Sequence, residues 1–312
     1  MRHAAVRMGI VMAVAVAGAS AMLIAGGQRG AGGQSPATGR GSAAPAKPPA
    51  DPHDLSGIWA RFGTREGRGN FQGNAPFPEA GDDGFGLDVP PLTAEGQKRY
   101  DAIKPGNGRP AGSEPRPGEP EGRRRAVVEK FQNDPTGLCT PSGLMRIILS
   151  TYFAPMELIM AKDRIVQHFE WTTDQRTIYT DGRKLPTEVS LPAWNGFSVG
   201  HWEGDALVVN SFGCHHNTWL DHFGYPHSDQ MRLEERYRLV SADRLQMEWT
   251  LTDPTVYTRP FVGQTKTFRR LAPEESTIED GWVGLFDNRC VPEEEFAFNE
   301  KIRNPAGGKT SK

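Results

Sequence analysis

The chain has 312 residues, with 36 Lys or Arg against 38 Asp or Glu, so its formal net charge is −2. This near balance, together with the lack of a basic stripe carrying interleaved aromatics, argues against a nucleic-acid partner. Hydrophobic residues make up 37% of the chain, which also holds 36 Gly and 25 Pro. Such a composition favours short strands and many turns over long helices.

The N-terminal segment has the pattern of an export signal. Arg2 and Arg7 give it a positive start, and residues 8–25 form an uninterrupted run of apolar or small residues. Small-x-small triplets inside this run are suited to cleavage. An uncleaved anchor is the alternative, although the run is short for a membrane span. We therefore expect residues 1–25 to be a signal peptide and the protein to be periplasmic or secreted, with no stable membrane span after cleavage.

The rest of the chain divides by composition. Residues 26–52 are mostly Gly, Ala, Pro and Ser and predict a flexible linker. We expect residues 53–299 to form a single β domain and residues 300–312 to be a flexible tail. One helix is predicted, with Thr93 as its N-cap and residues 94–103 as its body.

From residue 156 onward, apolar and polar residues alternate, which is the period of a strand with one buried face. About eight such strands in sequential order predict an all-β, mainly antiparallel domain. We expect a closed up-and-down barrel, because closure removes exposed edges and eight strands leave room for one small ligand. A two-sheet β-sandwich is the alternative. The expected strands cover residues 156–160, 164–171, 176–181, 196–202, 206–212, 231–240, 244–252 and 263–270.

Glu235 is the most informative residue of these strands. Strand periodicity places it on the same face as Leu233 and Tyr237, which is the inward, apolar side. An unpaired carboxylate there is costly, so we expect a raised pKa or a hydrogen-bond donor. A general acid or base and a ligand anchor are the functional interpretations. A structural pair with an Arg or Tyr, or a bulge that turns the side chain outward, stays open.

Apolar side chains that share the interior with Glu235 are expected to contact a ligand. His201 has the strand parity of Phe197 and Val199, which predicts that it faces inward, either as a ligand contact or as a satisfied core histidine. The predicted ligand-binding residues are Trp249, Met247, Tyr237, His201 and Trp219.

Histidines gather in the segment 201–227. His227 oriented by Asp221 is a candidate catalytic pair, which would exchange protons with a substrate together with Glu235. Cys214, His215 and His216 are candidate zinc or copper ligands, although their spacing matches no standard metal template. Ordinary hydrogen bonding within a loop is the alternative for this whole segment.

The chain has three cysteines, and two of them can pair in an oxidising compartment. We expect a Cys139–Cys290 disulfide, with Cys214 left free; the other two pairings stay open. Such a link would contribute about 2–5 kcal/mol to stability.

Several specific strings between residues 134 and 290 resemble a widespread group of uncharacterised exported bacterial β-rich proteins. The resemblance implies a secreted β-rich domain and brings no activity with it. One departure is the sequence Gly-Cys-His-His at 213–216, where that group commonly reads Gly-Phe-Asn-Asp. The matching strings lie at residues 134–136 with Cys139, and at 178–183, 200–209 (GHWEGDALVV), 218–221 (TWLD), 226–228 (PHS), 235–237 (ERY) and 253–254.

The triplet Gly57-Ile58-Trp59 is similar to the G-x-W of the first lipocalin strand. That resemblance implies that the up-and-down barrel is lipocalin-like and that a late arginine, Arg269 or Arg270, stacks on Trp59.

Three functions are compatible with these features. The first is an exported barrel that binds a small, partly apolar molecule in an internal cavity. The second is a lyase, isomerase or hydrolase that needs no organic cofactor and uses Glu235, His227 and Asp221. The third is a structural envelope protein without a pocket. The expected partner is a small-molecule ligand or substrate, and zinc is the one cofactor left open.

Overall fold

A computed structural model of the chain describes residues 47–61, 90–103, 134–149, 154–221, 224–279 and 282–294. The predicted signal peptide (1–25), most of the predicted linker (26–52) and the predicted tail (300–312) lie outside these ranges. Among the described residues, no helix has the length and hydrophobicity needed to cross a membrane.

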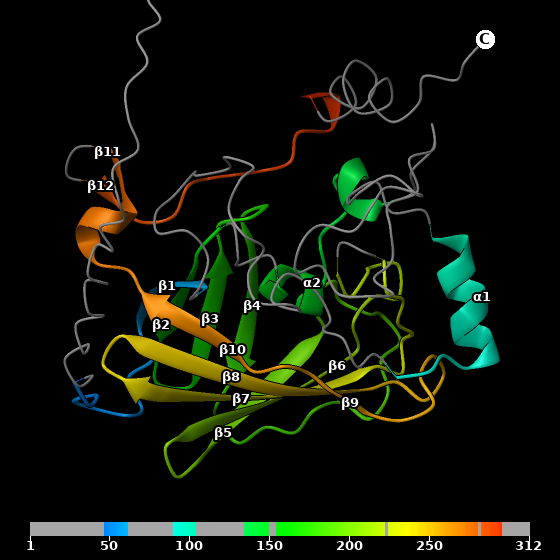
Figure 1. Cartoon of the computed structure of the whole chain (residues 1–312), viewed down its shortest axis with the longest axis horizontal. Helices are drawn as coiled ribbons and strands as arrows, with labels where there is room; N and C mark the ends of the chain where they lie inside the picture. The colour runs from blue at the N-terminus through cyan, green and yellow to red at the C-terminus, as the bar shows by residue number, and fades with distance from the viewer. Residues whose placement is uncertain are drawn as a thin grey trace, which may run out of the picture. The chain divides into compact units, whose positions relative to one another are not determined.

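The fold is mainly β, and nine strands close into a barrel (Figure 1). Each strand pairs with its neighbour in the chain from the first to the eighth, and the last strand closes the ring by pairing with both the eighth and the first. The barrel strands are β1 (Gly57–Arg61), β2 (Met156–Met160), β3 (Arg164–Phe169), β4 (Asp174–Tyr179), β5 (Phe197–Glu203), β6 (Ala206–Phe212), β7 (Arg232–Ser241), β8 (Arg244–Thr252) and β10 (Lys266–Arg270).

One pair departs from the up-and-down order. β4 and β5 are parallel, with Ile178 opposite Ser198, whereas the other described barrel pairs are antiparallel. A parallel neighbour requires a crossover connection rather than a tight turn. The segment 180–196 supplies this connection, and its residue Ala193 forms an isolated bridge with Cys214 after β6.

Three short strands lie outside the ring. β9 (Phe261–Val262) pairs with the end of β8, and β11 (Thr277–Glu279) pairs with β12 (Trp282–Val283) in a sheet of its own. The predictions for 156–160, 206–212 and 244–252 match the bounds of β2, β6 and β8, and the other predicted strands are present with shifted ends.

The predicted helix is present as α1 (Ala94–Ala102), and the Thr93 side chain accepts a hydrogen bond from the Gly96 amide as its N-cap. A second helix, α2 (Leu144–Leu149), was not predicted. All six of its residues are buried, so it lacks the amphipathic pattern that marks a surface helix. Its one charged residue, Arg146, forms two hydrogen bonds of 2.7 and 2.8 Å with Asp134 at the start of the 3-10 helix η1 (Pro135–Leu138).

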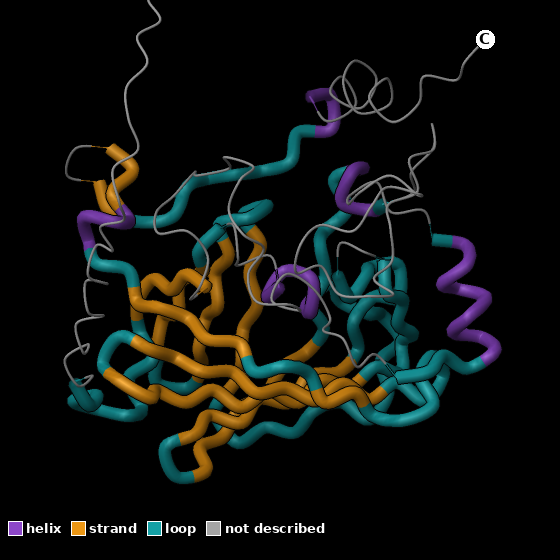
Figure 2. Tube along the Cα trace, viewed as in Figure 1, coloured by secondary structure: helices purple, strands orange, loops and turns teal. Residues whose placement is uncertain are grey.

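The hydrophobic core lies inside the barrel and continues into α2. Figure 2 shows α2 as the purple helix at the centre of the view, with the orange strands beside it. The apolar residues of α2 belong to one buried cluster with inward side chains of the strands, among them Trp59, Met156 and Met247. Each of these three side chains is fully buried.

Two predicted contacts are confirmed. Cys139 and Cys290 form a disulfide with a Cα–Cα distance of 5.4 Å, and Cys214 is free and buried. The guanidinium carbon of Arg270 lies 4.5 Å from the centre of the Trp59 ring, which is the contact that the lipocalin resemblance implies. Arg270 also donates to the backbone carbonyl of Ser56, so it joins β10 to the entry of β1.

Candidate functional site

Five side chains from four strands are joined by polar contacts inside the barrel, and we call them the interior cluster. Glu235 and Tyr237 come from β7, Arg176 from β4, Gln167 from β3 and Met156 from β2. All five are buried, which confirms that Glu235 faces inward. Strand periodicity explains this, because Glu235 and Tyr237 alternate with exposed or half-exposed residues along β7.

Glu235 is held by two side chains. The Arg176 guanidinium donates from Nη1 to Oε2 and from Nη2 to Oε1, both at 2.7 Å, and Tyr237 donates from Oη to Oε1 at 2.6 Å. Because β5 and β6 lie between β4 and β7 in the sheet, this ion pair crosses the barrel interior. The structure therefore provides the Arg and the Tyr partner that the sequence left open.

The guanidinium is fixed from a second side. Arg176 Nε donates to Gln167 Oε1 at 2.6 Å, and Gln167 Nε2 donates to the Met156 sulfur at 3.0 Å. The Nη2 atom of Arg176 also lies 3.3 Å from Tyr237 Oη. The ion pair thus has one defined orientation inside the barrel.

Burial governs the protonation of the groups around this pair. It raises the pKa of Tyr237 well above its ordinary value, and the charge of Glu235 adds to the effect. It also raises the pKa of the Cys214 thiol to about 12, although Arg176 opposes the rise. Burial alone would lower the pKa of Arg176, but attraction to the Glu235 carboxylate is the stronger effect, and the net result is a raised pKa. Tyr237 and Cys214 are therefore neutral, and Arg176 is charged, at neutral pH.

Four of the five predicted ligand-binding residues are buried, and the fifth, His201, is exposed. Trp249, Met247 and Tyr237 are buried on the inward face, and Trp219 is buried in the segment after β6, with the Arg146 guanidinium carbon 5.6 Å from its ring. The expectation that His201 faces inward is wrong.

The His201 side chain is 57% exposed and lies 3.0 Å from Glu203. The inward positions of β5 are instead Ser198 and Gly200, which are buried. The hydroxyl of Ser198 bonds to that of Ser211 on β6 at 2.8 Å. The small residues Ser198 and Gly200 thus face inward, whereas Phe197 and His201 face outward, which is the opposite of the prediction.

His227 belongs to a second group of polar contacts, outside the strands. Its Nε2 lies 2.7 Å from Thr218 Oγ1, and its Nδ1 lies 2.9 Å from the carbonyl oxygen of Ser228. Since a carbonyl oxygen only accepts, Nδ1 carries a proton. The Thr218 hydroxyl has one hydrogen, which it can donate either to Nε2 of the neutral ring or to the His215 carbonyl 3.0 Å away. Burial lowers the pKa of His227, opposed by the Ser228 carbonyl and by the charge of Asp253.

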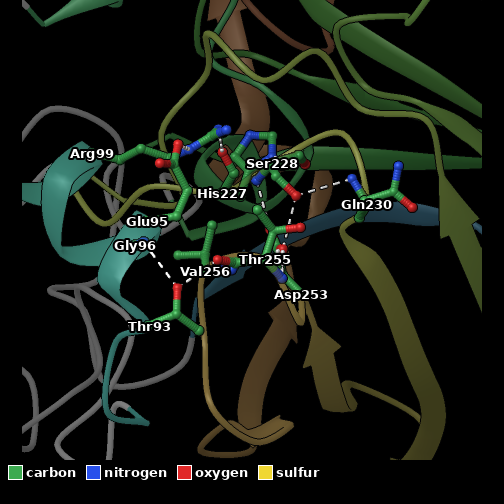
Figure 3. A network of polar contacts seen from close by, with 10 residues as sticks. All are labelled: Thr93, Glu95, Gly96, Arg99, His227, Ser228, Gln230, Asp253, Thr255 and Val256. Atoms are coloured by element: carbon green, nitrogen blue, oxygen red, sulfur yellow. Dashed lines mark hydrogen bonds and ion pairs between the residues drawn. The ribbon is translucent and has the colours of Figure 1, made fainter.

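Asp253, directly after β8, connects this histidine to its surroundings (Figure 3). Its carboxylate accepts from the Ser228 amide at 2.5 Å and from the Ser228 hydroxyl at 2.8 Å, and also from the amides of Thr255 and Val256 at 3.2 and 3.3 Å. We call His227, Thr218, Ser228 and Asp253 the loop cluster. No prediction named Thr218, Ser228 or Asp253 as site residues, although an Asp before Pro is a known turn signal.

The loop cluster holds α1 in place. Figure 3 shows α1 with Thr93 and Arg99 facing the two loops. Thr93 Oγ1 donates to the Thr255 carbonyl at 2.5 Å, and Arg99 Nη1 donates to the His227 carbonyl at 3.1 Å. These contacts are those of a structural junction between three segments of the chain.

The three predicted catalytic residues have separate hydrogen-bond partners. Glu235 bonds to Arg176 and Tyr237, and both ring nitrogens of His227 face other partners, Thr218 and Ser228. Asp221 is fully buried and accepts from the Tyr225 amide at 3.3 Å. These contacts do not join Glu235, His227 and Asp221 into one proton-transfer chain, and their catalytic role stays a prediction.

The predicted metal ligands point to different surroundings. Cys214 is buried in the core, whereas the His215 ring stacks on Trp194 and on His216, with centroids 4.4 and 5.0 Å away. Within the described ranges, no group of three or more His, Cys, Asp or Glu side chains is placed to hold a metal ion. Zinc binding at this segment stays a prediction.

Comparison of the chain with protein-family models, with curated proteins and with solved structures finds no match. No relative therefore assigns a role to the interior cluster or to the loop cluster. The resemblance to exported β-rich bacterial proteins stays an expectation, and function has to be argued from the geometry of the two clusters.

Proposed function

We propose that this chain is an exported binding protein that holds a small, partly apolar molecule inside its barrel, against the interior cluster. The observation that carries this proposal is the Arg176–Glu235 ion pair, whose side chains are 2% and 0% exposed. A buried ion pair is often no more stabilising than apolar residues of the same volume. Its presence in the buried interior suits recognition of a polar group better than it suits stability.

The buried core contains flexible side chains that a ligand could displace on entry. The inward side chains are buried from solvent, so a ligand needs side chains that can move aside for it to enter. Methionine has three rotatable bonds and adapts to irregular spaces. Four buried methionines belong to the core cluster: Met145, Met156, Met231 and Met247.

Export is supported by two features of the chain. The N-terminal sequence has a positive start and an apolar run typical of a signal peptide. The Cys139–Cys290 disulfide is of a kind that persists in oxidising compartments. Together they support a periplasmic or secreted location.

A fluorescence titration tests the proposal. The neutral apolar dye N-phenyl-1-naphthylamine should bind the intact chain saturably, with a stoichiometry of about one, as expected for one small-ligand site in a barrel of this size. Met156→Phe should weaken dye binding by at least about tenfold, because it overfills the interior next to Gln167.

The matched control is Ile159→Phe on the same strand, whose side chain is 46% exposed and faces outward. It should leave dye binding unchanged, and urea unfolding should show both variants folded. Absence of saturable binding, or equal loss in both variants, would overturn the proposal and favour a structural envelope protein.

A further inference from the structure

The hydrogen bonds of Arg176 leave one donor of the interior cluster unused. A guanidinium has five N–H donors. Four contacts engage them: Nε with Gln167, Nη1 with Glu235, and Nη2 with Glu235 and Tyr237. One N–H of Nη1 is thus left without an acceptor among the described residues, in a side chain that is 2% exposed. A buried donor of this kind costs free energy unless it finds a partner.

Glu235 has an unused acceptor beside that donor. Its Oε1 accepts from both Arg176 Nη2 and Tyr237 Oη, whereas its Oε2 accepts from Arg176 Nη1 alone. A carboxylate oxygen can accept two hydrogen bonds. Nη1 and Oε2 are 2.7 Å apart, so the spare donor and the spare acceptor lie at the same edge of the ion pair. We call it the open edge; Tyr237 occupies the opposite one.

The charges at the open edge restrict what can bind there. Arg176 and Glu235 neutralise each other, so the pair as a whole carries no net charge. A ligand anion would be repelled by Glu235 and a ligand cation by Arg176, and either would lose its hydration on burial. A group that only accepts hydrogen bonds would leave Oε2 unused, and one that only donates would leave Nη1 unused.

We infer that the ligand presents a neutral group that both donates and accepts, a hydroxyl or a primary amide, to the Arg176–Glu235 open edge; this rests on the binding function proposed above. Its oxygen accepts from Arg176 Nη1, and its own hydrogen is donated to Glu235 Oε2. The rest of the molecule is apolar, because the cross-strand neighbours of Glu235 are Val209 and Trp249, both buried.

Four probes of similar shape separate these possibilities on the unchanged protein: toluene, benzyl alcohol, benzoate and benzylamine. Each is used at neutral pH to displace bound N-phenyl-1-naphthylamine. Benzyl alcohol should displace the dye at a concentration at least about tenfold lower than toluene, since a site built to hydrogen-bond a hydroxyl rejects the analogue that lacks it. Benzoate and benzylamine should be weaker than benzyl alcohol.

A charge change at the edge should reverse the preference. Glu235→Gln keeps the shape of the side chain and leaves the Arg176 charge unbalanced, so benzoate should become the tightest of the four probes. The matched control is Glu234→Gln, which removes the same charge from the outward face of β7, where Glu234 is exposed. It should keep the preference for benzyl alcohol.

The outcomes are distinct. If the dye binds but benzyl alcohol is no tighter than toluene, the inferred ligand class is wrong and the binding function stands. If the unchanged protein prefers benzoate or benzylamine, the ligand class is likewise wrong. If the dye does not bind at all, the proposed function fails, and the ligand class fails with it. The probe series on the unchanged protein decides this even where Glu235→Gln does not fold.

Discussion

The interior cluster and the loop cluster each bury a carboxylate, and they satisfy it in different ways. Glu235 is 0% exposed and Asp253 is 1% exposed. Glu235 is held by the side chains of Arg176 and Tyr237. Asp253 is held mainly by backbone amides, with one hydroxyl from Ser228.

The difference follows from where each residue sits. Inside a barrel the backbone amides are used by the strand ladders, so a carboxylate on β7 can be satisfied only by side chains that reach across the interior. In a turn the amides are free, and an Asp can bond to those that follow it. The two clusters therefore depend on different parts of the chain: Glu235 on one long-range ion pair, and Asp253 on the shape of its own loop and of the neighbouring one.

The largest effect is expected from Arg176→Met. This change leaves Glu235 buried without its charged partner, and breaking a buried pair from one side costs about 3–5 kcal/mol. The free energy of unfolding, measured by urea denaturation, should fall by this amount. The double variant Arg176→Met with Glu235→Leu should recover most of the loss, because it removes both charges together.

An exposed ion pair between β7, the strand of Glu235, and β5 provides the control. Arg236 Nη2 lies 2.7 Å from Glu203, and their side chains are 34% and 48% exposed. Arg236→Met should cost at most about 1 kcal/mol, because water screens the pair. Equal losses for Arg176→Met and Arg236→Met would show that the interior pair is not isolated from solvent.

The next effect is expected from Asp253→Ala. It leaves the amides of Ser228 and Thr255 without their side-chain acceptor, whereas the Val256 amide keeps the backbone carbonyl of residue 253 at 3.1 Å. Bonds to a charged group are worth about 1.5–3 kcal/mol each, although such losses are not additive. We expect a loss of about 2–4 kcal/mol, and a smaller one for Asp253→Asn, which keeps an acceptor oxygen. Hydrogen exchange should accelerate at the Ser228 and Thr255 amides while β6 and β7 keep their protection. Uniform acceleration across the barrel would instead tie the loop cluster to global unfolding.

Much of the fold could be predicted from alternation alone. β2 and β8 match the predictions because buried apolar residues alternate with more exposed ones along each strand. α2 was missed because a helix buried on every side shows no amphipathic period. The parallel pairing of β4 with β5 was missed because the alternation within a strand does not indicate which strand it pairs with or in which direction.

The candidate site shows the same limits. Glu235 could be placed by parity, since its neighbours Leu233 and Tyr237 define the dry face of β7. Its partner Arg176 could not, because β4 carries few apolar residues that would mark its inward face. His201 was assigned to the wrong face for a related reason, as the inward positions of β5 are a serine and a glycine. The loop cluster joins three distant segments, and no local pattern reports such contacts.

The smallest predicted effect is a pH dependence that separates the clusters. Burial lowers the pKa of His227 in the folded state, whereas its ordinary value in an unfolded chain is about 6.5. The unfolded chain therefore takes up the proton first, so the stability that His227 contributes is present above about pH 6.5 and is lost as the pH falls through its lowered pKa.

His227→Gln should flatten this part of the curve of unfolding free energy against pH, because Gln does not titrate. The measurement is a series of urea denaturations between neutral and mildly acidic pH. The groups that act on His227 are Asp253 and the Ser228 carbonyl, which raise its pKa, and His216 and Arg99, which lower it. The control is His201→Gln, since the His201 side chain is 57% exposed; it should keep the slope of the unchanged protein. A slope that His227→Gln leaves intact would mean that the acid sensitivity arises elsewhere and that the loop cluster, like the interior cluster, keeps one protonation state through this range.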